Sequence, residues 1–180
     1  SLKQVDNKRS FNGEQRKYTH YSNVLQSEMT FSIYLPSNKE NKEIPLVWWL
    51  SGLTCTDDNF SEKSGFQGWA DKYQVAVVIP DTSPRGEDVA NDEAYDLGQG
   101  AGFFLNATQE PWAKNYQMYS YITEELAEIA STLVPNFSGK ESIMGPSMGG
   151  RGALVIVLKT ESNFKPISAF YTFTNPVKIQ

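Results

Sequence analysis

The sequence has few of the features that mark secreted or membrane proteins. Its 180 residues include a single cysteine, Cys55, so an internal disulfide is excluded and a reducing compartment is favoured. No apolar run approaches the roughly 20 residues needed to cross a bilayer. The first residues, Ser1–Asp6, lack the apolar region of a signal peptide. We therefore expect a cytoplasmic protein without a membrane partner.

An excess of positive charge is also lacking. The formal net charge is −5, and the acidic residues are scattered along the chain, so nucleic acid is not an expected partner. The 39% hydrophobic and 13% aromatic content suits one globular domain with a sizeable core. No repeat or linker interrupts the chain. We expect a single domain over residues 1–180.

One stretch, Ser142–Leu154, carries the strongest functional signal. Within it, Gly145-Pro146-Ser147-Met148-Gly149 fits the G-x-S-x-G pattern of a nucleophile elbow. In that motif a strand ends, the chain reverses sharply and a helix begins, with the serine at the apex and small residues two positions away. The pattern predicts Ser147 as a nucleophile and the Met148 N–H as an oxyanion donor. A glycine-rich turn with an ordinary surface serine is the alternative.

Histidine is nearly absent, which conflicts with this chemistry. A serine hydrolase usually uses a histidine base that follows the nucleophile in the chain. The one histidine, His20, precedes Ser147. Neither a histidine nor an aspartate follows Ser147 in the sequence. We expect His20 to be structural. We also expect Cys55 to be a thiol lining the pocket rather than an alternative nucleophile. The sequence thus contains a nucleophile without its partners.

Hydrophobic patterning predicts strands that alternate with helices after an antiparallel start. The predicted strands cover residues 16–21 at a sheet edge, 29–35, 46–50, 75–79, 142–144 and 167–171, with a hairpin-like loop at 37–43. Helices are predicted over 60–73, with three aromatic residues on one face, and over 116–133. The stretch 81–115 lacks periodicity, and its length and aromatic content predict an ordered lid or pocket wall. The expected fold is an α/β-hydrolase with a mostly parallel central sheet flanked by helices, lacking the C-terminal strands and helices of the full fold.

Several longer stretches resemble one family, the S-formylglutathione hydrolases, also called esterase D. These stretches are Leu50–Thr56, Pro80–Gly86, Tyr95–Phe103, Asn106–Gln109 with Pro111-Trp112, Tyr116–Tyr119 and the elbow itself. They occur in order over nearly the whole chain. The resemblance implies a cytosolic thioesterase and carboxylesterase that hydrolyses S-formylglutathione to glutathione and formate, in formaldehyde detoxification. It implies no metal or organic cofactor, and a Ser-Asp-His triad.

The resemblance also assigns further site residues. It makes the backbone N–H of Leu53 the second oxyanion donor, beside that of Met148. Trp49, Cys55 and Arg151 are pocket candidates. Pro146 and Arg151 depart from the family pattern, which has histidine at both places. Arg151 would support an anionic acyl group or a glutathione carboxylate, or be a solvated helix residue; we favour the solvated residue because exposed arginines are common.

Three functions therefore stay open. The first is the serine thioesterase above, with the missing acid and base supplied by an absent segment or by a second chain; a homodimer is a further expectation. The second is a catalytically inactive, truncated hydrolase-fold domain. The third is a general short-chain carboxylesterase, acting on aryl esters and not on S-formylglutathione.

Overall fold

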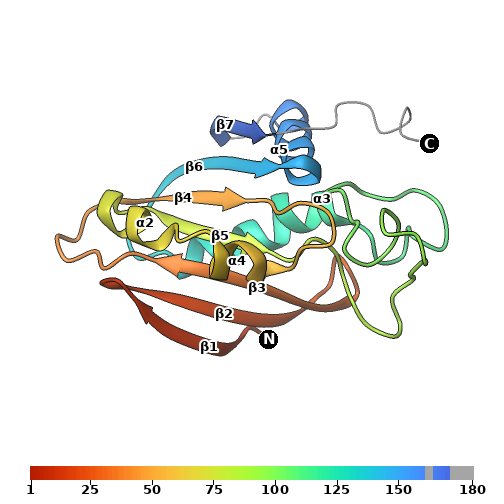
Figure 1. Cartoon of the computed structure of the whole chain (residues 1–180), viewed down its shortest axis with the longest axis horizontal. Helices are drawn as coiled ribbons and strands as arrows, with labels where there is room; N and C mark the ends of the chain where they lie inside the picture. Colours follow the sequence, from red (N-terminus) through yellow and green to blue (C-terminus); the bar gives the residue numbers. More distant parts are fainter. Residues whose placement is uncertain (161–163, 171–180) are drawn as a thin grey trace.

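A single twisted sheet forms the centre of the molecule. The computed structural model describes residues 1–160 and 164–170, and for 164–170 the backbone only. The seven strands lie in the order β1(Lys3–Ser10), β2(Gly13–Ser22), β3(Ser27–Leu35), β5(Ala76–Pro80), β4(Ile44–Trp49), β6(Phe137–Pro146) and β7(Phe164–Phe170) (Figure 1). Within this described part, the three pairings from β1 to β5 are antiparallel and the three from β5 to β7 are parallel. The sheet is therefore mixed, and the prediction of a mostly parallel sheet was too strong.

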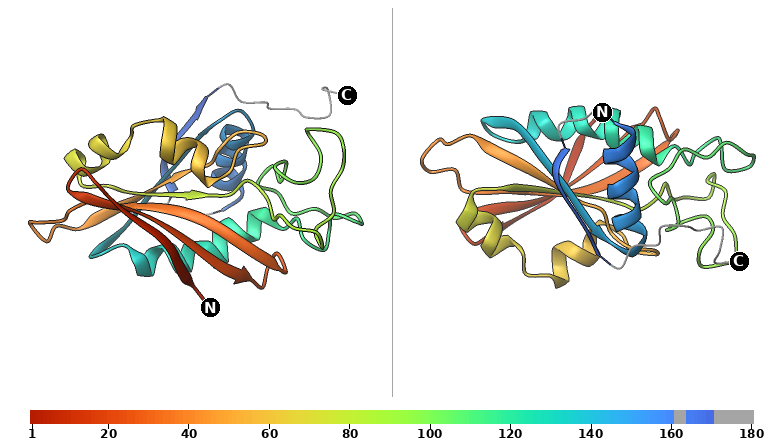
Figure 2. Two further views of the ribbon diagram at one scale, coloured as in Figure 1. Left: turned by 60° about the horizontal axis from the view of Figure 1, so that its bottom comes forward. Right: turned by 90° about the horizontal axis from the view of Figure 1, so that it is seen from above.

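Helices cover both faces of the sheet (Figure 2). The helices α1(Asp57–Lys63) and α2(Gln67–Tyr73) lie on one face. On the other lie α5(Ser147–Lys159) and a continuous helical segment composed of α3(Met118–Ser120), the π-helical turn η1(Tyr121–Glu125) and α4(Leu126–Leu133). None of the helices in the described residues has the length and apolar character that a membrane crossing requires.

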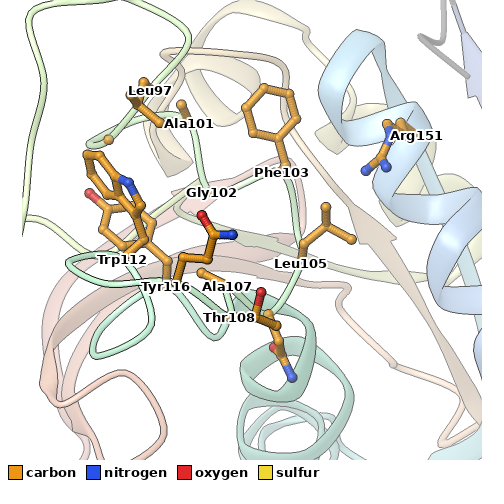
Figure 3. A pocket seen from close by; sticks show the side chains of 13 residues that line it. Leu97, Ala101, Gly102, Phe103, Leu105, Ala107, Thr108, Trp112, Tyr116 and Arg151 are labelled. Atoms are coloured by element: carbon orange, nitrogen blue, oxygen red, sulfur yellow. The ribbon is translucent and has the colours of Figure 1, made fainter. Parts of the chain in front are cut away.

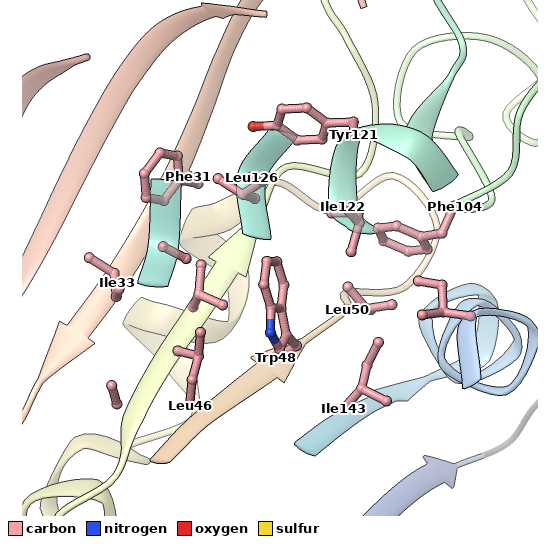
Figure 4. Close-up of a cluster of buried hydrophobic side chains, with 14 of the residues drawn as sticks. Phe31, Ile33, Leu46, Trp48, Leu50, Phe104, Tyr121, Ile122, Leu126 and Ile143 are labelled. Atoms are coloured by element: carbon pink, nitrogen blue, oxygen red, sulfur yellow. The ribbon is translucent and has the colours of Figure 1, made fainter. Parts of the chain in front are cut away.

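Two adjacent tryptophans show how β4 divides the core. Trp48 is fully buried in the larger hydrophobic cluster, with Leu126 from α4 (Figure 4). Ile156 from α5 belongs to the same cluster. Trp49 points to the opposite face and stacks on Phe60 of α1, with ring centroids 3.8 Å apart. Alternation along a strand that is covered on both faces explains the unbroken apolar run. The strand prediction for residues 46–50 is thereby confirmed.

Other predicted elements differ from the structure in informative ways. The strand at residues 16–21 belongs to β2, which is not an edge, because the unpredicted β1 pairs with it. The loop at 37–43 is not a hairpin, since β3 pairs with β5 rather than with β4. The helix over 116–133 is confirmed, with the π turn inside it.

The predicted helix over 60–73 is two short helices instead of one. Residues 64–66 separate α1 from α2. The aromatic residues Trp69 and Tyr73 do not form a buried face: they are 63% and 64% exposed, stacked on each other, with the ammonium of Lys72 over both rings. Helical spacing predicted that these aromatic residues share one side of the helix, but it could not predict whether that side is buried.

His20 lies in the core, away from the elbow. Its Nε2 is 3.0 Å from the hydroxyl of Tyr121, and the two rings are stacked. The imidazole is buried, and this burial lowers its pKa below the ordinary value of 6.5, although the carboxylate of Glu125 opposes the shift. The expectation of a structural histidine agrees with this placement.

The buried His20 gives a pH-dependent stability. Because its folded-state pKa is lowered, the stabilisation is present above pH 6.5 and is lost as the pH falls toward the folded-state pKa. We expect the full-length protein to lose up to about 1.4 kcal/mol per pH unit over this range, relative to His20→Gln, which does not titrate. Urea unfolding at pH 7 and pH 5.5 measures this difference. Parallel pH profiles for the two proteins would contradict it.

Candidate active site

The predicted nucleophile elbow is present as a structural feature. Strand β6 ends at Pro146 and α5 begins at Ser147, which has a φ of 51°. A residue other than glycine in this left-handed region costs roughly 1–3 kcal/mol, and such strain is typical of functional positions. The strand–turn–helix prediction for this stretch is confirmed. The bend places the half-buried Ser147 at the carboxyl end of β6.

Glycines allow the backbone of another strand to approach this bend. A β-carbon added to Gly145 or to Gly149 would collide with the carbonyl oxygen of Leu50, which directly follows β4. The Leu50 N–H also donates to the carbonyl of Met144, at 2.8 Å. As a result the segment after β4 lies against the elbow: a β-carbon built on Gly52 would be 3.8 Å from that of Ser147.

Two backbone N–H groups are available beside Ser147. The Met148 N–H is in the first turn of α5, where N–H groups have no partner within the helix and the helix dipole favours negative charge. The Leu53 N–H follows Gly52, and no described residue accepts a hydrogen bond from it. This arrangement suits a developing oxyanion. The roles of Leu53 and Met148 stay predictions.

A braced loop holds the segment after β4 in place. Arg85 donates to both carboxylate oxygens of Asp81, at 2.9–3.1 Å, and to the carbonyl of Cys55, at 3.1 Å. The hydroxyl of Thr82 donates to the same Cys55 carbonyl, at 2.5 Å. The N–H of Thr54 donates to the carbonyl of Gly100, at 2.9 Å. Loops 81–85 and 98–102 therefore fix the backbone that carries the Leu53 N–H.

The pairing of Arg85 with Asp81 was not among the predictions from the sequence. The signal was available, because the two residues are four apart and of opposite charge.

A cavity opens beside the elbow rather than at Ser147 itself. Its volume is about 400 Å³, and its walls come mainly from residues 97–109, from Trp112 and Tyr116, and from Arg151 of α5 (Figure 3). Ser147 does not line it. Of the three pocket candidates, Arg151 lines this cavity; Trp49 stacks on Phe60, and Cys55 is half-buried in the loop after β4. The prediction that residues 81–115 form a pocket wall agrees with this cavity.

Arg151 is not the solvated helix residue that we favoured. Its side chain is half-buried, and its Nε and Nη1 atoms are buried with no hydrogen-bond partner among the described residues. Burial lowers the pKa of the guanidinium from its ordinary value. Helical position alone gave no signal for this, because the other residues that line the cavity are distant in sequence.

Within the described residues, no cluster of three histidine, cysteine or acidic side chains has the arrangement of a metal site. Nor do those residues place a histidine beside Ser147, because His20 is bound to Tyr121.

Comparison with known proteins identifies the family. Residues 22–179 match the family model described as "Putative esterase". The chain belongs to this esterase family. It is 48% identical, over 96% of its length, to the S-formylglutathione hydrolase of Paracoccus denitrificans, of which it spans 62%. The resemblance to S-formylglutathione hydrolases noted in the sequence is thereby confirmed.

Solved structures agree with this assignment. An S-formylglutathione hydrolase from Agrobacterium tumefaciens superposes with a TM-score of 0.92 at 44% identity, covering 96% of this chain and 63% of that one. The fluorophosphonate-binding serine hydrolase F of Staphylococcus aureus gives 0.70 at 16% identity, covering 93% of this chain and 60% of that one, and shows the shared fold alone. The α/β-hydrolase fold class is confirmed. The esterase chain described here spans less than two thirds of each relative.

The close approach at Gly149 predicts a large cost for adding one methyl group. Gly149→Ala should destabilise the full-length protein by at least about 3 kcal/mol, since the new carbon meets backbone atoms that cannot rotate away. The matched control is Gly139→Ala, at a φ of 73° with open space around it, where about 1 kcal/mol is expected from backbone strain alone. Urea unfolding compares the two, and equal losses would contradict the proposed close packing.

Proposed function

We propose that the full-length protein is a serine thioesterase that hydrolyses S-formylglutathione to glutathione and formate. The observation that carries this proposal is the strained Ser147 at the strand–helix junction, with the backbone of Gly52 directly beside it. The similarity to two S-formylglutathione hydrolases supports the choice of substrate. A cytoplasmic location and a role in formaldehyde detoxification belong to the same proposal.

The reaction proceeds through an acyl-enzyme. The Ser147 Oγ attacks the thioester carbonyl carbon while a base takes its proton, and the carbonyl oxygen becomes an oxyanion. The N–H groups of Leu53 and Met148 donate to that oxygen, and each such donor contributes on the order of 3 kcal/mol to lowering the barrier. The C–S bond then breaks, and the glutathione sulfur leaves with the proton. Water next attacks the formyl ester, the bond to Oγ breaks, and formate is released with the serine hydroxyl restored.

The base and its supporting acid come from outside the described residues in this proposal. The relatives are longer than this chain, and a histidine that follows the nucleophile is the usual arrangement in this fold. A segment of the same polypeptide is the simplest source, and a second copy in a homodimer is the other. Without base and acid, only a residual acceleration of about 10³–10⁴ over water would remain.

Removal of the nucleophile tests the proposal directly. Ser147→Ala should lower kcat for S-formylglutathione and for p-nitrophenyl acetate by at least about 10⁴-fold, because no acyl-enzyme forms. It should also abolish the mass increase that a fluorophosphonate adds to the full-length protein. The matched control, Cys55→Ala, should retain both.

Three outcomes separate the readings of this experiment. Turnover of the aryl ester without the thioester identifies a general carboxylesterase. A wild-type protein that turns over neither substrate is an inactive hydrolase-fold domain. Loss of activity in Cys55→Ala with retention in Ser147→Ala would overturn the assignment of the nucleophile.

A second test uses the hydrogen bonds that hold the segment after β4, which carries the Leu53 N–H. Arg85→Lys keeps a positive charge beside Asp81 but loses the guanidinium fork that also reaches the Cys55 carbonyl. We expect kcat for p-nitrophenyl acetate to fall about tenfold with KM within twofold, because a misaligned donor affects the transition state more than binding.

The matched control is Arg16→Lys. Arg16 forms a partly exposed ion pair with Glu14 on β2. The control substitution should leave both constants unchanged. If Arg85→Lys instead raised KM about tenfold and left kcat unchanged, the bracing loop would act on substrate binding rather than on the transition state.

A further inference from the structure

The cavity beside the elbow is lined mainly by apolar groups, and Arg151 is the one charged residue among those that line it. Phe103, Leu105, Trp112 and neighbouring backbone form much of its wall, and Arg151 enters from α5 on the opposite side (Figure 3). The labelled side chains in that view show the guanidinium directed toward the loop that carries Phe103 and Leu105. A cavity of about 400 Å³ is large enough for part of a small-molecule substrate.

The buried N–H donors of the Arg151 guanidinium lack a hydrogen-bond acceptor among the described residues. These donors are on Nε and Nη1. By contrast, Arg85 and Arg16 both pair with carboxylates, those of Asp81 and Glu14. An unpaired buried charge is costly, and buried polar groups in native proteins are nearly always satisfied. An anion bound in the cavity would remove this cost.

The chemistry of the group defines the anion. A guanidinium presents N–H donors in a planar fork that matches a carboxylate with two parallel hydrogen bonds. The apolar walls favour a ligand whose charge is confined to one end. A neutral short-chain ester offers neither feature and would leave Arg151 unpaired.

Position on the helix determines which part of the substrate reaches this cavity. Arg151 is four residues after Ser147, one helical turn and about 6 Å along the axis. Side chains four apart lie on the same side of a helix. A formyl group bound at Ser147 contains one carbon and cannot span that distance. The thiol portion of the substrate is long enough, and glutathione carries two free carboxylates.

We propose that the cavity holds the leaving thiol portion of the substrate, and that Arg151 binds one of its carboxylates and so determines specificity for acidic thioesters. The choice of glutathione rests on the proposed function. The family pattern, with histidine at this position, does not supply a permanently charged fork there. The rival reading is structural: a carboxylate elsewhere in the full-length protein pairs with Arg151 and no substrate group does.

An inert ligand tests the site without requiring thioester turnover. S-methylglutathione has no acyl group to transfer, so its inhibition constant against hydrolysis of p-nitrophenyl acetate reports binding alone. We expect this constant to rise at least tenfold when both carboxylates of the inhibitor are methylated, and at least tenfold in Arg151→Met. In Arg151→Met, methylation should add little further loss, because the partner of the carboxylate is already absent. Arg151→Lys should recover part of the affinity.

The controls separate this inference from folding and from the proposed function. Lys159→Met, an exposed change on the same helix, should bind the inhibitor as the wild type does. In Arg151→Met, kcat/KM for S-formylglutathione should fall at least tenfold more than that for p-nitrophenyl acetate. Inhibition that depends on Arg151 without turnover of S-formylglutathione would support the anion site and reject the proposed substrate.

One result overturns the inference even if Arg151→Met does not fold. If the wild type binds S-methylglutathione and its dimethyl ester equally well, no substrate carboxylate pairs with Arg151. Equal losses for acidic and neutral ligands in a folded Arg151→Met would likewise assign the residue a structural role.

Discussion

The contact between the Leu50 carbonyl and the glycines of the elbow underlies the rest of the candidate site. Two elements distant in sequence, the end of β4 and the start of α5, approach so closely that no side chain fits between them. This approach places the backbone of Gly52 beside Ser147 and brings the N–H of Leu53 to the same end of the sheet as that of Met148. Any atom added between them would separate Ser147 from the Leu53 N–H, the predicted second oxyanion donor.

Strain at Ser147 is tolerated because the surroundings leave it no alternative. The residue adopts a left-handed conformation between a strand that is paired on both sides and a 13-residue helix whose Ala153 and Ile156 are fully buried. Relaxing the bend would disturb these elements, which costs more than the roughly 1–3 kcal/mol stored in the backbone. The loop after β4 is held in a comparable way, through the hydrogen bonds of Arg85 and Thr82 to the Cys55 carbonyl. Rigid donors need no reorganisation during reaction, which is the physical basis of oxyanion stabilisation.

Prediction from the sequence succeeded where the signal was local. Strand β4 appeared as an unbroken apolar run, β3 as an alternating one, and the elbow as closely spaced glycines around a serine. It failed where a distant segment decided the outcome. Strand β1 has no buried face to mark it, and the exposure of Trp69 and Tyr73 follows from what covers α2. Similarly, the unbroken apolar run Leu46–Leu50 shows that the strand is covered on both faces, but it does not distinguish a mostly parallel sheet from the mixed one observed.

The sequence by itself determined the family, the fold class and the position of the candidate nucleophile, because these depend on residue types at fixed short spacings. Only the tertiary structure decided the environments of His20 and Arg151. The imidazole is buried against Tyr121, 101 residues away, and the guanidinium lines a cavity whose other walls come from a segment some 50 residues earlier in the chain. Burial and pairing are properties of groups that meet through folding, and the energy of a charge depends on its neighbours in space rather than in sequence.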